Sequence, residues 1–265
     1  MNYSTIIYEK KDRIAKITLN RPDVLNAINI TMREEFSQAV DDAASDENIG
    51  VLITTGAGRA YSAGMDLKES GGILQGMKVG KAGIVSPSDK IRNLPIPTIC
   101  AVNGYAVTGG LELAIAHDIL IASENAAFAD THARVGVLPN GGASQMLPRL
   151  VGVTRAKLAS FTGNYISAQE AYHFGGIAML VPPDELMPTA EKIAQDMLSC
   201  NQEVLHRVKF LINEGMKTNL EIGLRLEKVE TMHRRAKMQA TTAEEATKIR
   251  ETVLERGRVQ KKRSK

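Results

Sequence analysis

Three short runs of consecutive apolar residues, separated by turns and helical segments, constrain this fold more than any other feature of the sequence. They are residues 51–53 (Val-Leu-Ile), 99–102 (Ile-Cys-Ala-Val) and 119–122 (Ile-Leu-Ile-Ala). A run without polar alternation predicts a strand covered on both faces, which is typical of parallel sheets. Because helical patterns lie between the runs, for example over 111–116, we predict an α/β fold.

The N-terminal part is predicted to contain one further strand and a long helix. Residues 15–19 alternate between apolar and polar side chains, the pattern of a half-buried strand. Residues 20–23 (Asn-Arg-Pro-Asp) then break the strand as a turn. Thr31 and Glu34 have the spacing of a capping box, and predict a helix that ends near Ser45.

After Leu147 the strand patterns nearly disappear and helical patterns replace them. Ser167 and Glu170 form a second capping-box pattern, which predicts a short helix. We therefore expect an α/β core over residues 1–195 and a helical C-terminal region over 196–265, of a kind that often packs on neighbouring subunits. Longer helices are predicted at 184–200, 203–213, 221–237 and from the Thr241–Glu244 capping box to about Arg256.

The positive charge of the chain is concentrated at its C-terminus. Residues 256–265 carry six Lys and Arg side chains and no acidic one, and removing these six charges from the net charge of +3 leaves −3. A nucleic-acid-binding domain normally spreads basic residues over a folded face. We interpret the basic tail as a solvated chain end, with nucleic-acid binding as the alternative.

Cysteine usage and hydropathy favour a cytoplasmic location. Cys100 and Cys200 are too far apart in sequence to form a disulfide framework, which indicates a reducing compartment. Residues 1–12 contain no apolar stretch followed by a cleavage site. No segment approaches the roughly 18 apolar residues of a membrane span.

Several common catalytic motifs are absent. The Gly104–Gly109 spacing begins like a phosphate-binding loop, but Gly110 and Leu111 stand where that loop needs Lys and Ser or Thr. No G-x-G-x-x-G follows a strand and no G-x-S-x-G is present. The histidines do not form HExxH, so we expect no metal site.

Two glycine-rich corners, residues 58–67 and 103–113, each follow a predicted strand. In the second corner, small residues lead directly into a helix, whose first N–H groups point outward and can bind an anion. Glu112 lies in the first turn of that otherwise apolar helix. It is either a structural carboxylate stabilised by the helix N-terminus or an acid–base group beside the bound ligand.

These corners and the motifs around them resemble the crotonase superfamily, the enoyl-CoA hydratase/isomerase family. The resemblance covers about residues 5–195, in order and at the family's spacing, and implies a ββα spiral core followed by a C-terminal helical extension. The matching motifs are Leu19-Asn20-Arg21-Pro22, Asn26-Ala27, Ser62-Ala63-Gly64-Met65-Asp66-Leu67, Ala101-Val102-Asn103-Gly104 through Glu112-Leu113, Phe128-Ala129, Gly136-Val137-Leu138-Pro139, Leu147 through Gly152, and Thr162-Gly163 through Ala171.

The resemblance also implies residue roles. The backbone N–H groups of Met65 and Gly109 would form an oxyanion hole for a thioester carbonyl. Glu112 would be the general base for attack of water at C3. The second glutamate of the hydratases corresponds to His132, which is either a partner in catalysis or a bystander, and Asp130 is a further, weaker candidate.

For the coenzyme A part of the substrate, the resemblance implies contacts along the first corner. Arg21 and basic residues of the tail are candidates for its phosphates, and the glycine-rich stretch from Ser70 to Ser88 for a mobile loop over the acyl chain. No separate cofactor is implied. The residues assigned to substrate binding are Arg21, Ala60, Ser62, Ala63, Gly64, Asp66, Leu67 and Gly110.

The activity implied by the resemblance is hydration of a trans-2-enoyl-CoA to a 3-hydroxyacyl-CoA. The alternatives are another reaction of this family (isomerisation, hydrolysis, or hydration of a cyclic or aromatic acyl-CoA) and a non-catalytic acyl-CoA or RNA binder. Members of this family assemble as trimers or pairs of trimers, so we expect a homo-trimer or a dimer of trimers.

Overall fold

The computed structural model describes residues 3–68, 86–237 and 243–263. The chain forms two compact units, Met1–Lys209 and Phe210–Lys265. Most of the glycine-rich stretch expected to be a mobile loop lies outside the described residues. Its last part is helical instead, because Pro87 begins helix α2 (Pro87–Arg92), and proline favours the first turn of a helix.

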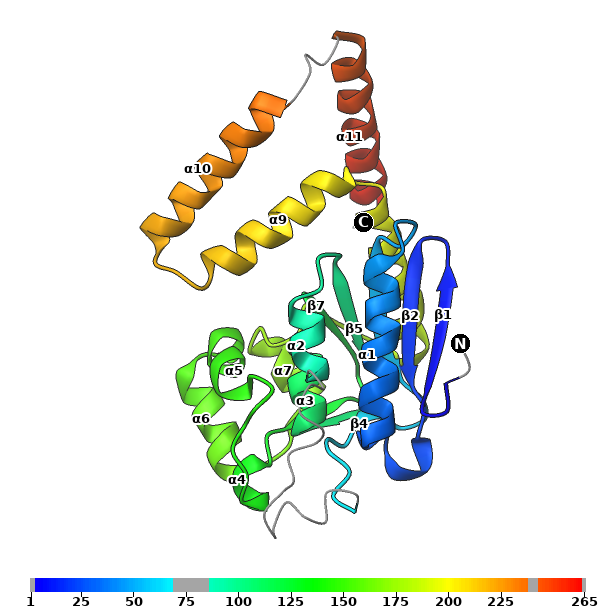
Figure 1. The fold of residues 1–265 in the computed structure, drawn as a ribbon, viewed down its shortest axis with the longest axis vertical. Helices are drawn as coiled ribbons and strands as arrows, with labels where there is room; N and C mark the ends of the chain where they lie inside the picture. The colour runs from blue at the N-terminus through cyan, green and yellow to red at the C-terminus, as the bar shows by residue number, and fades with distance from the viewer. Residues whose placement is uncertain (1–2, 69–85, 238–242, 264–265) are drawn as a thin grey trace. The chain divides into compact units, whose positions relative to one another are not determined.

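A six-stranded sheet forms the centre of the first unit (Figure 1). Its strand order is β1-β2-β3-β5-β7-β10, and all neighbouring pairs are parallel except the β1–β2 hairpin. The three apolar runs form the central strands β3, β5 and β7, as predicted. The strands are β1 (Ile6–Lys11), β2 (Ile14–Leu19), β3 (Val51–Gly56), β5 (Thr98–Val102), β7 (Ile119–Ser123) and β10 (Met179–Val181).

Each central strand contributes alternate side chains to two different cores. Leu52 and Cys100 pack in the core that includes residues of α1 (Ile30–Ser45), whereas Ile53 and Ile99 pack against α8 (Leu186–Leu198). Figure 1 shows α1 lying along β2. Since both faces are covered, both sets of side chains are apolar, which explains the lack of alternation in these runs.

The helix α1 begins earlier than predicted. Asn29 is its N-cap, and the Asn29 side chain accepts a hydrogen bond from the backbone N–H of Met32. Thr31 and Glu34 therefore lie inside the first turns, and the capping box predicted there is wrong. The physical reason is that asparagine caps a helix at least as well as threonine, so the earlier residue takes the position.

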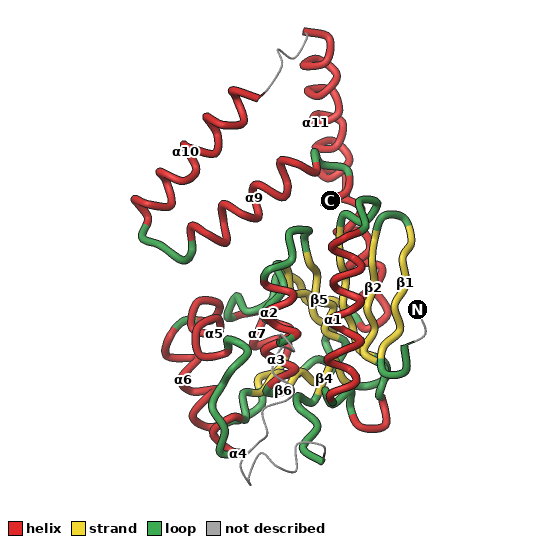
Figure 2. The backbone as a smooth tube through the Cα atoms, in the orientation of Figure 1, coloured by secondary structure: helices red, strands yellow, loops and turns green. Residues whose placement is uncertain are grey.

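A smaller second sheet completes a repeated ββα unit (Figure 2). The pairs β3/β4, β5/β6 and β7/β8 each place one strand in each sheet, and the helices α2, α3 (Gly109–Ala114) and α4 (His132–Val135) follow them. This arrangement confirms the predicted α/β spiral core. The strands of the second sheet, in spatial order, are β4 (Ala60–Ser62), β6 (Tyr105–Val107), β8 (Ala127–Ala129) and β9 (Ile166–Ser167).

The rest of the chain is mainly helical, as predicted. The capping box of Ser167 and Glu170 is present at the start of α7 (Ala168–His173). The last helix reaches Arg263, beyond the predicted end at Arg256, and Thr241 lies outside the described residues. Within the described part, no helix combines the length and apolar character needed to cross a membrane. The remaining helices are α5 (Ala143–Val151), α6 (Val153–Thr162), α9 (Gln202–Gly215), α10 (Leu220–Lys237), α11 (Ala243–Arg263) and the short 3-10 helices η1 (Pro22–Val24) and η2 (Pro183–Glu185).

His117, in the turn between α3 and β7, is buried as a neutral ring. Its Nδ1 lies 2.9 Å from the carbonyl oxygen of Leu113, which can only accept, so Nδ1 carries the proton. Its Nε2 lies 2.9 Å from Thr54 Oγ1 and accepts the hydroxyl proton. Burial lowers the pKa of His117 to about 4, because an imidazolium ion would lose its hydration there.

Acidification should therefore destabilise the fold through His117. Its pKa is about 4 in the folded protein and near 6.5 when unperturbed, so the unfolded state binds more protons between these values and stability falls as the pH drops from 6.5 toward 4. We expect a loss on the order of 1–2 kcal/mol between pH 7 and pH 5 in urea unfolding experiments. His117→Gln has no imidazole to protonate and should lose less; an equal loss in both proteins would contradict this origin.

Candidate active site

The two glycine-rich corners meet through their backbones. Met65 forms an isolated parallel bridge with Ile28. In this bridge the N–H of Ile28 donates to the Gly64 carbonyl, and the carbonyl of Ile28 accepts from the N–H of Asp66. This pattern leaves the N–H of Met65 outside the bridge. A Cβ placed on Gly109 would lie 3.5 Å from the Met65 nitrogen, so the two predicted backbone donors lie close together.

Both of these N–H groups are left unpaired by the described part of the chain. The N–H of Gly109 belongs to the first residue of α3, where the helix supplies no acceptor. Over the described ranges, neither this N–H nor that of Met65 donates to a backbone carbonyl or a side chain. Two neighbouring free donors of this kind can bind an oxygen atom on which negative charge develops.

Thr108 holds the second corner in a strained conformation. Its φ of 50° and ψ of −110° are unfavourable for a β-branched residue, at a cost of about 1–3 kcal/mol. Its hydroxyl is hydrogen-bonded to the hydroxyl of Thr131, the residue before α4, and its N–H donates to the Ala129 carbonyl. These contacts connect the N-terminus of α3 to that of α4.

Glu112 points from the first turn of α3 into the protein and is only 5% exposed. Its Oε1 accepts hydrogen bonds from the backbone N–H groups of Gly141 (2.8 Å) and Ala143 (3.1 Å). Arg92 holds this loop in place through a 2.7 Å hydrogen bond to the Gly141 carbonyl. Burial by itself raises the pKa of Glu112, but His132 and the two N–H groups outweigh burial, and the pKa is lowered.

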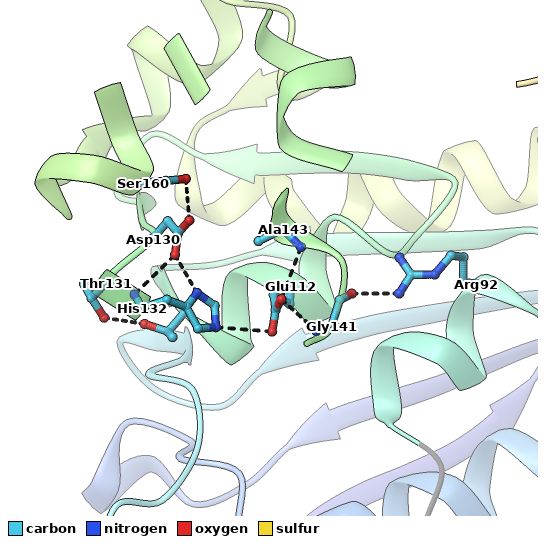
Figure 3. A network of polar contacts seen from close by, with 9 residues as sticks. Arg92, Glu112, Asp130, Thr131, His132, Gly141, Ala143 and Ser160 are labelled. Atoms are coloured by element: carbon cyan, nitrogen blue, oxygen red, sulfur yellow. Dashed lines mark hydrogen bonds and ion pairs between the residues drawn. The ribbon is translucent and has the colours of Figure 1, made fainter. Parts of the chain in front are cut away.

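His132, the first residue of α4, lies between two carboxylates (Figure 3). Its Nε2 forms an ion pair with Glu112 Oε2 at 3.5 Å, and its Nδ1 lies 2.6 Å from Asp130 Oδ1. Burial lowers the pKa of His132, but the hydrogen bond to Asp130 and the charge of Glu112 outweigh it and raise the pKa to about 9. At neutral pH the site therefore contains an ionised Glu112, which can accept a proton, and a protonated His132, which can donate one.

Most of the other predicted site residues belong to the first corner, with Arg21 bound to it and Gly110 in the second corner. Arg21 forms an ion pair with Asp66 at 2.8 Å and donates to the Ala27 carbonyl. The hydroxyl of Ser62 donates to the Asn26 carbonyl and accepts from the N–H of Gly64. These contacts fix the corner, and the substrate contacts of its residues stay a prediction. Ala60, Gly64 and Gly110 are buried, Ala63 is half-buried and Leu67 is exposed.

The sequence did not identify the groups that hold Glu112 and His132. Arg92, the Gly141–Ala143 loop and Ser160 are distant in sequence from the residues they contact. The glycine pair Gly141-Gly142 before α5 is a sequence signal that could have indicated this loop, because paired glycines are typical of a backbone that approaches another group closely. A Cβ on Gly141 would lie 2.7 Å from Glu112 Oε2.

A ββα spiral with paired free amides beside a buried carboxylate and imidazolium has the character of an acid–base enzyme site. The family model described as "Enoyl-CoA hydratase/isomerase" matches residues 9–256. The chain belongs to the enoyl-CoA hydratase/isomerase family.

Individual relatives cover most of the chain. It is 37% identical over 255 residues to the probable peroxisomal enoyl-CoA hydratase 1 of Arabidopsis thaliana, covering 95% of this chain and 94% of that protein. It is 36% identical over 230 residues to a short-chain-enoyl-CoA hydratase of Clostridium acetobutylicum, covering 86% and 88%. Among solved structures, an enoyl-CoA hydratase from Mycobacterium tuberculosis H37Rv aligns with a TM-score of 0.73 at 39% identity, covering 88% of this chain and all of that one. One from Bacillus anthracis aligns with a TM-score of 0.79 at 34% identity, covering 85% and 88%.

Proposed function

We propose that this chain is an enoyl-CoA hydratase, which reversibly adds water across the C2–C3 double bond of a trans-2-enoyl-CoA. The observation that carries the proposal is the oppositely charged Glu112–His132 pair, with Nε2 and Oε2 3.5 Å apart. Glu112 lies on α3, the helix that begins with the free amide of Gly109, and His132 lies on α4. The names of the relatives support the same reaction.

Charge develops on the thioester oxygen in this reaction. That oxygen accepts hydrogen bonds from the N–H groups of Met65 and Gly109, which polarise the conjugated double bond. As water attacks C3, electron density moves to the oxygen and gives an enolate, which the two fixed donors stabilise most in the transition state. Met65 contributes only backbone, so its side chain is free to vary.

The two side chains divide the proton transfers. Glu112 removes a proton from the attacking water, and the remaining hydroxyl forms the bond to C3. His132 then donates its Nε2 proton to C2 as the enolate collapses. Glu112 is now neutral and His132 uncharged, and a proton passing from Oε2 to Nε2 restores both groups for the next turnover.

The coenzyme A moiety is proposed to bind along the first corner. Ala60, Ser62, Ala63, Gly64, Asp66 and Leu67, together with Gly110 and Arg21, are the residues assigned to it. Coenzyme A is part of the substrate, so the reaction needs no separate cofactor or metal. A homo-trimer or dimer of trimers in the cytoplasm completes the proposal.

A different reaction on acyl-CoA is the second candidate. His132 stands where the hydratases have their second glutamate, and an imidazolium can also protonate other enolates, as in double-bond isomerisation, or assist thioester hydrolysis.

A panel of acyl-CoA thioesters followed by mass spectrometry separates these reactions. We expect trans-2-enoyl-CoA to lose its conjugated absorbance and gain the mass of one water. Conversion without a change in mass would indicate an isomerase, and release of free coenzyme A would indicate a hydrolase. Either result in place of hydration would contradict the proposal.

A further inference from the structure

Asp130 lies directly before α4 and is almost completely buried, with 1% of its surface exposed. Both of its carboxylate oxygens are occupied by donors of the chain. Oδ1 accepts from the ring Nδ1 of His132 at 2.6 Å and from the His132 backbone N–H at 3.3 Å. Oδ2 accepts from the hydroxyl of Ser160, on α6, at 2.5 Å.

Burying a carboxylate is costly unless its hydrogen bonds are satisfied. The hydrogen bonds of Asp130 offset this cost. Two of them hold the backbone and the ring of His132, and the third, from Ser160, holds the Asp130 carboxylate itself. Because Nδ1 is held by Asp130, the other nitrogen, Nε2, is directed toward Glu112 (Figure 3). The order Ser160, Asp130, His132, Glu112 therefore forms one continuous chain of polar contacts from α6 to α3.

We propose that Asp130, anchored by Ser160, is a positioning residue that keeps the His132 ring oriented and protonated for proton donation at C2. This inference rests on the proposed hydratase function and adds to it the origin of the acid. Asp130 would act as the buried carboxylate of a catalytic triad does. Such a carboxylate binds the Nδ1–H of the histidine, fixes its tautomer and stabilises the imidazolium without touching the substrate.

The charges around His132 agree with this role. Among the described residues, the charged groups paired with its ring are Glu112 from α3 and Asp130 from the segment before α4. Arg134 of α4 is bound to Asn164, and Arg92 of α2 to the Gly141 carbonyl. Glu112 becomes neutral when it takes the proton from water, so Asp130 is the carboxylate that stays ionised beside the imidazolium during proton donation.

Asp130→Asn tests the proposal through the pH dependence of kcat/KM and through the NMR titration of His132. We expect kcat to fall by about 10–100-fold and the alkaline limb of the profile to move down by about one pH unit or more, because a neutral amide no longer stabilises the ring charge. The NMR signal of the His132 ring is the one that disappears in His132→Gln. In Asp130→Asn this signal should titrate at a correspondingly lower pH. Asp130→Glu should move the alkaline limb and the His132 titration part of the way back to their parent values. Ser160→Ala should lower both pH values as Asp130→Asn does, by a smaller amount.

Asp184→Asn, an exposed carboxylate of η2, is the matched control and should change neither readout. If Asp130→Asn does not fold, Ser160→Ala and Asp130→Glu carry the test. The proposal is overturned if the folded variants leave the alkaline limb and the His132 titration unchanged, whatever happens to stability. The NMR titration needs no substrate, so an enzyme that fails to hydrate enoyl-CoA would refute the proposed function without deciding the role of Asp130.

Discussion

Glu112→Gln should lower kcat for enoyl-CoA hydration by about 10²–10⁴-fold, because an amide cannot accept the proton of the attacking water. The substitution keeps the size of the side chain, and its oxygen can still accept from Gly141 and Ala143. The proposed coenzyme A and oxyanion contacts come from other residues, so KM should change little. Steady-state kinetics with a trans-2-enoyl-CoA measure both constants.

A second effect of the same substitution separates a chemical role from a structural one. The amide nitrogen of Gln would face the protonated Nε2 of His132, placing two donors where an ion pair stood at 3.5 Å. The pKa of His132 should therefore fall from about 9, and its NMR titration should show this. Glu124→Gln, an exposed residue after β7, is the control for loss of a glutamate. A rate within a few-fold of the parent enzyme would exclude Glu112 as the base.

Much of the larger sheet could be predicted from local sequence patterns, whereas the second sheet could not. The runs at 51–53 and 99–102 are visible because both faces of these strands are buried. The strands β4, β6 and β8 have three residues each, too few to show a period of two. Their presence followed only from the family resemblance, which carries information about pairing that local patterns lack.

The candidate site divides in the same way. Glu112 and the glycine-rich corners could be identified because helix starts and glycines have local signatures. Asp130 ranked as a weak candidate from sequence, yet the structure places it on the ring of His132. Other groups of the site, such as the Gly141 N–H on Glu112 and Ser160 on Asp130, come from segments about 30 residues away. Only the folded chain brings them together.

Gly109→Ala should abolish most of the activity and leave the fold intact. The new methyl group would lie 3.5 Å from the Met65 nitrogen and 3.6 Å from the Met65 Cγ, ordinary contact distances that require no movement of the backbone. It would nevertheless occupy the space in front of a donor that the thioester oxygen needs. Loss of one such donor costs about 10²–10³-fold in kcat. Alanine is favoured over glycine in a helix, so thermal stability should be unchanged or slightly higher.

The neighbouring glycine provides a control with the opposite behaviour. A Cβ on Gly110 would lie 2.2 Å from the carbonyl oxygen of Ser62, so Gly110→Ala must push the two corners apart and should lower the unfolding temperature as well as the rate. Measuring kcat and thermal unfolding for both variants compares the two positions directly.

If Gly109→Ala retains full activity, the oxyanion does not bind between these amides. If it loses stability like Gly110→Ala, its loss of activity says nothing about the donors, and the Asp130 and Glu112 variants then remain the evidence for the site. The two glycines are adjacent on α3 and differ in what faces them. A ligand bound at the Met65 and Gly109 amides therefore predicts that Gly109→Ala lowers the rate without lowering stability, whereas Gly110→Ala lowers both the rate and the stability.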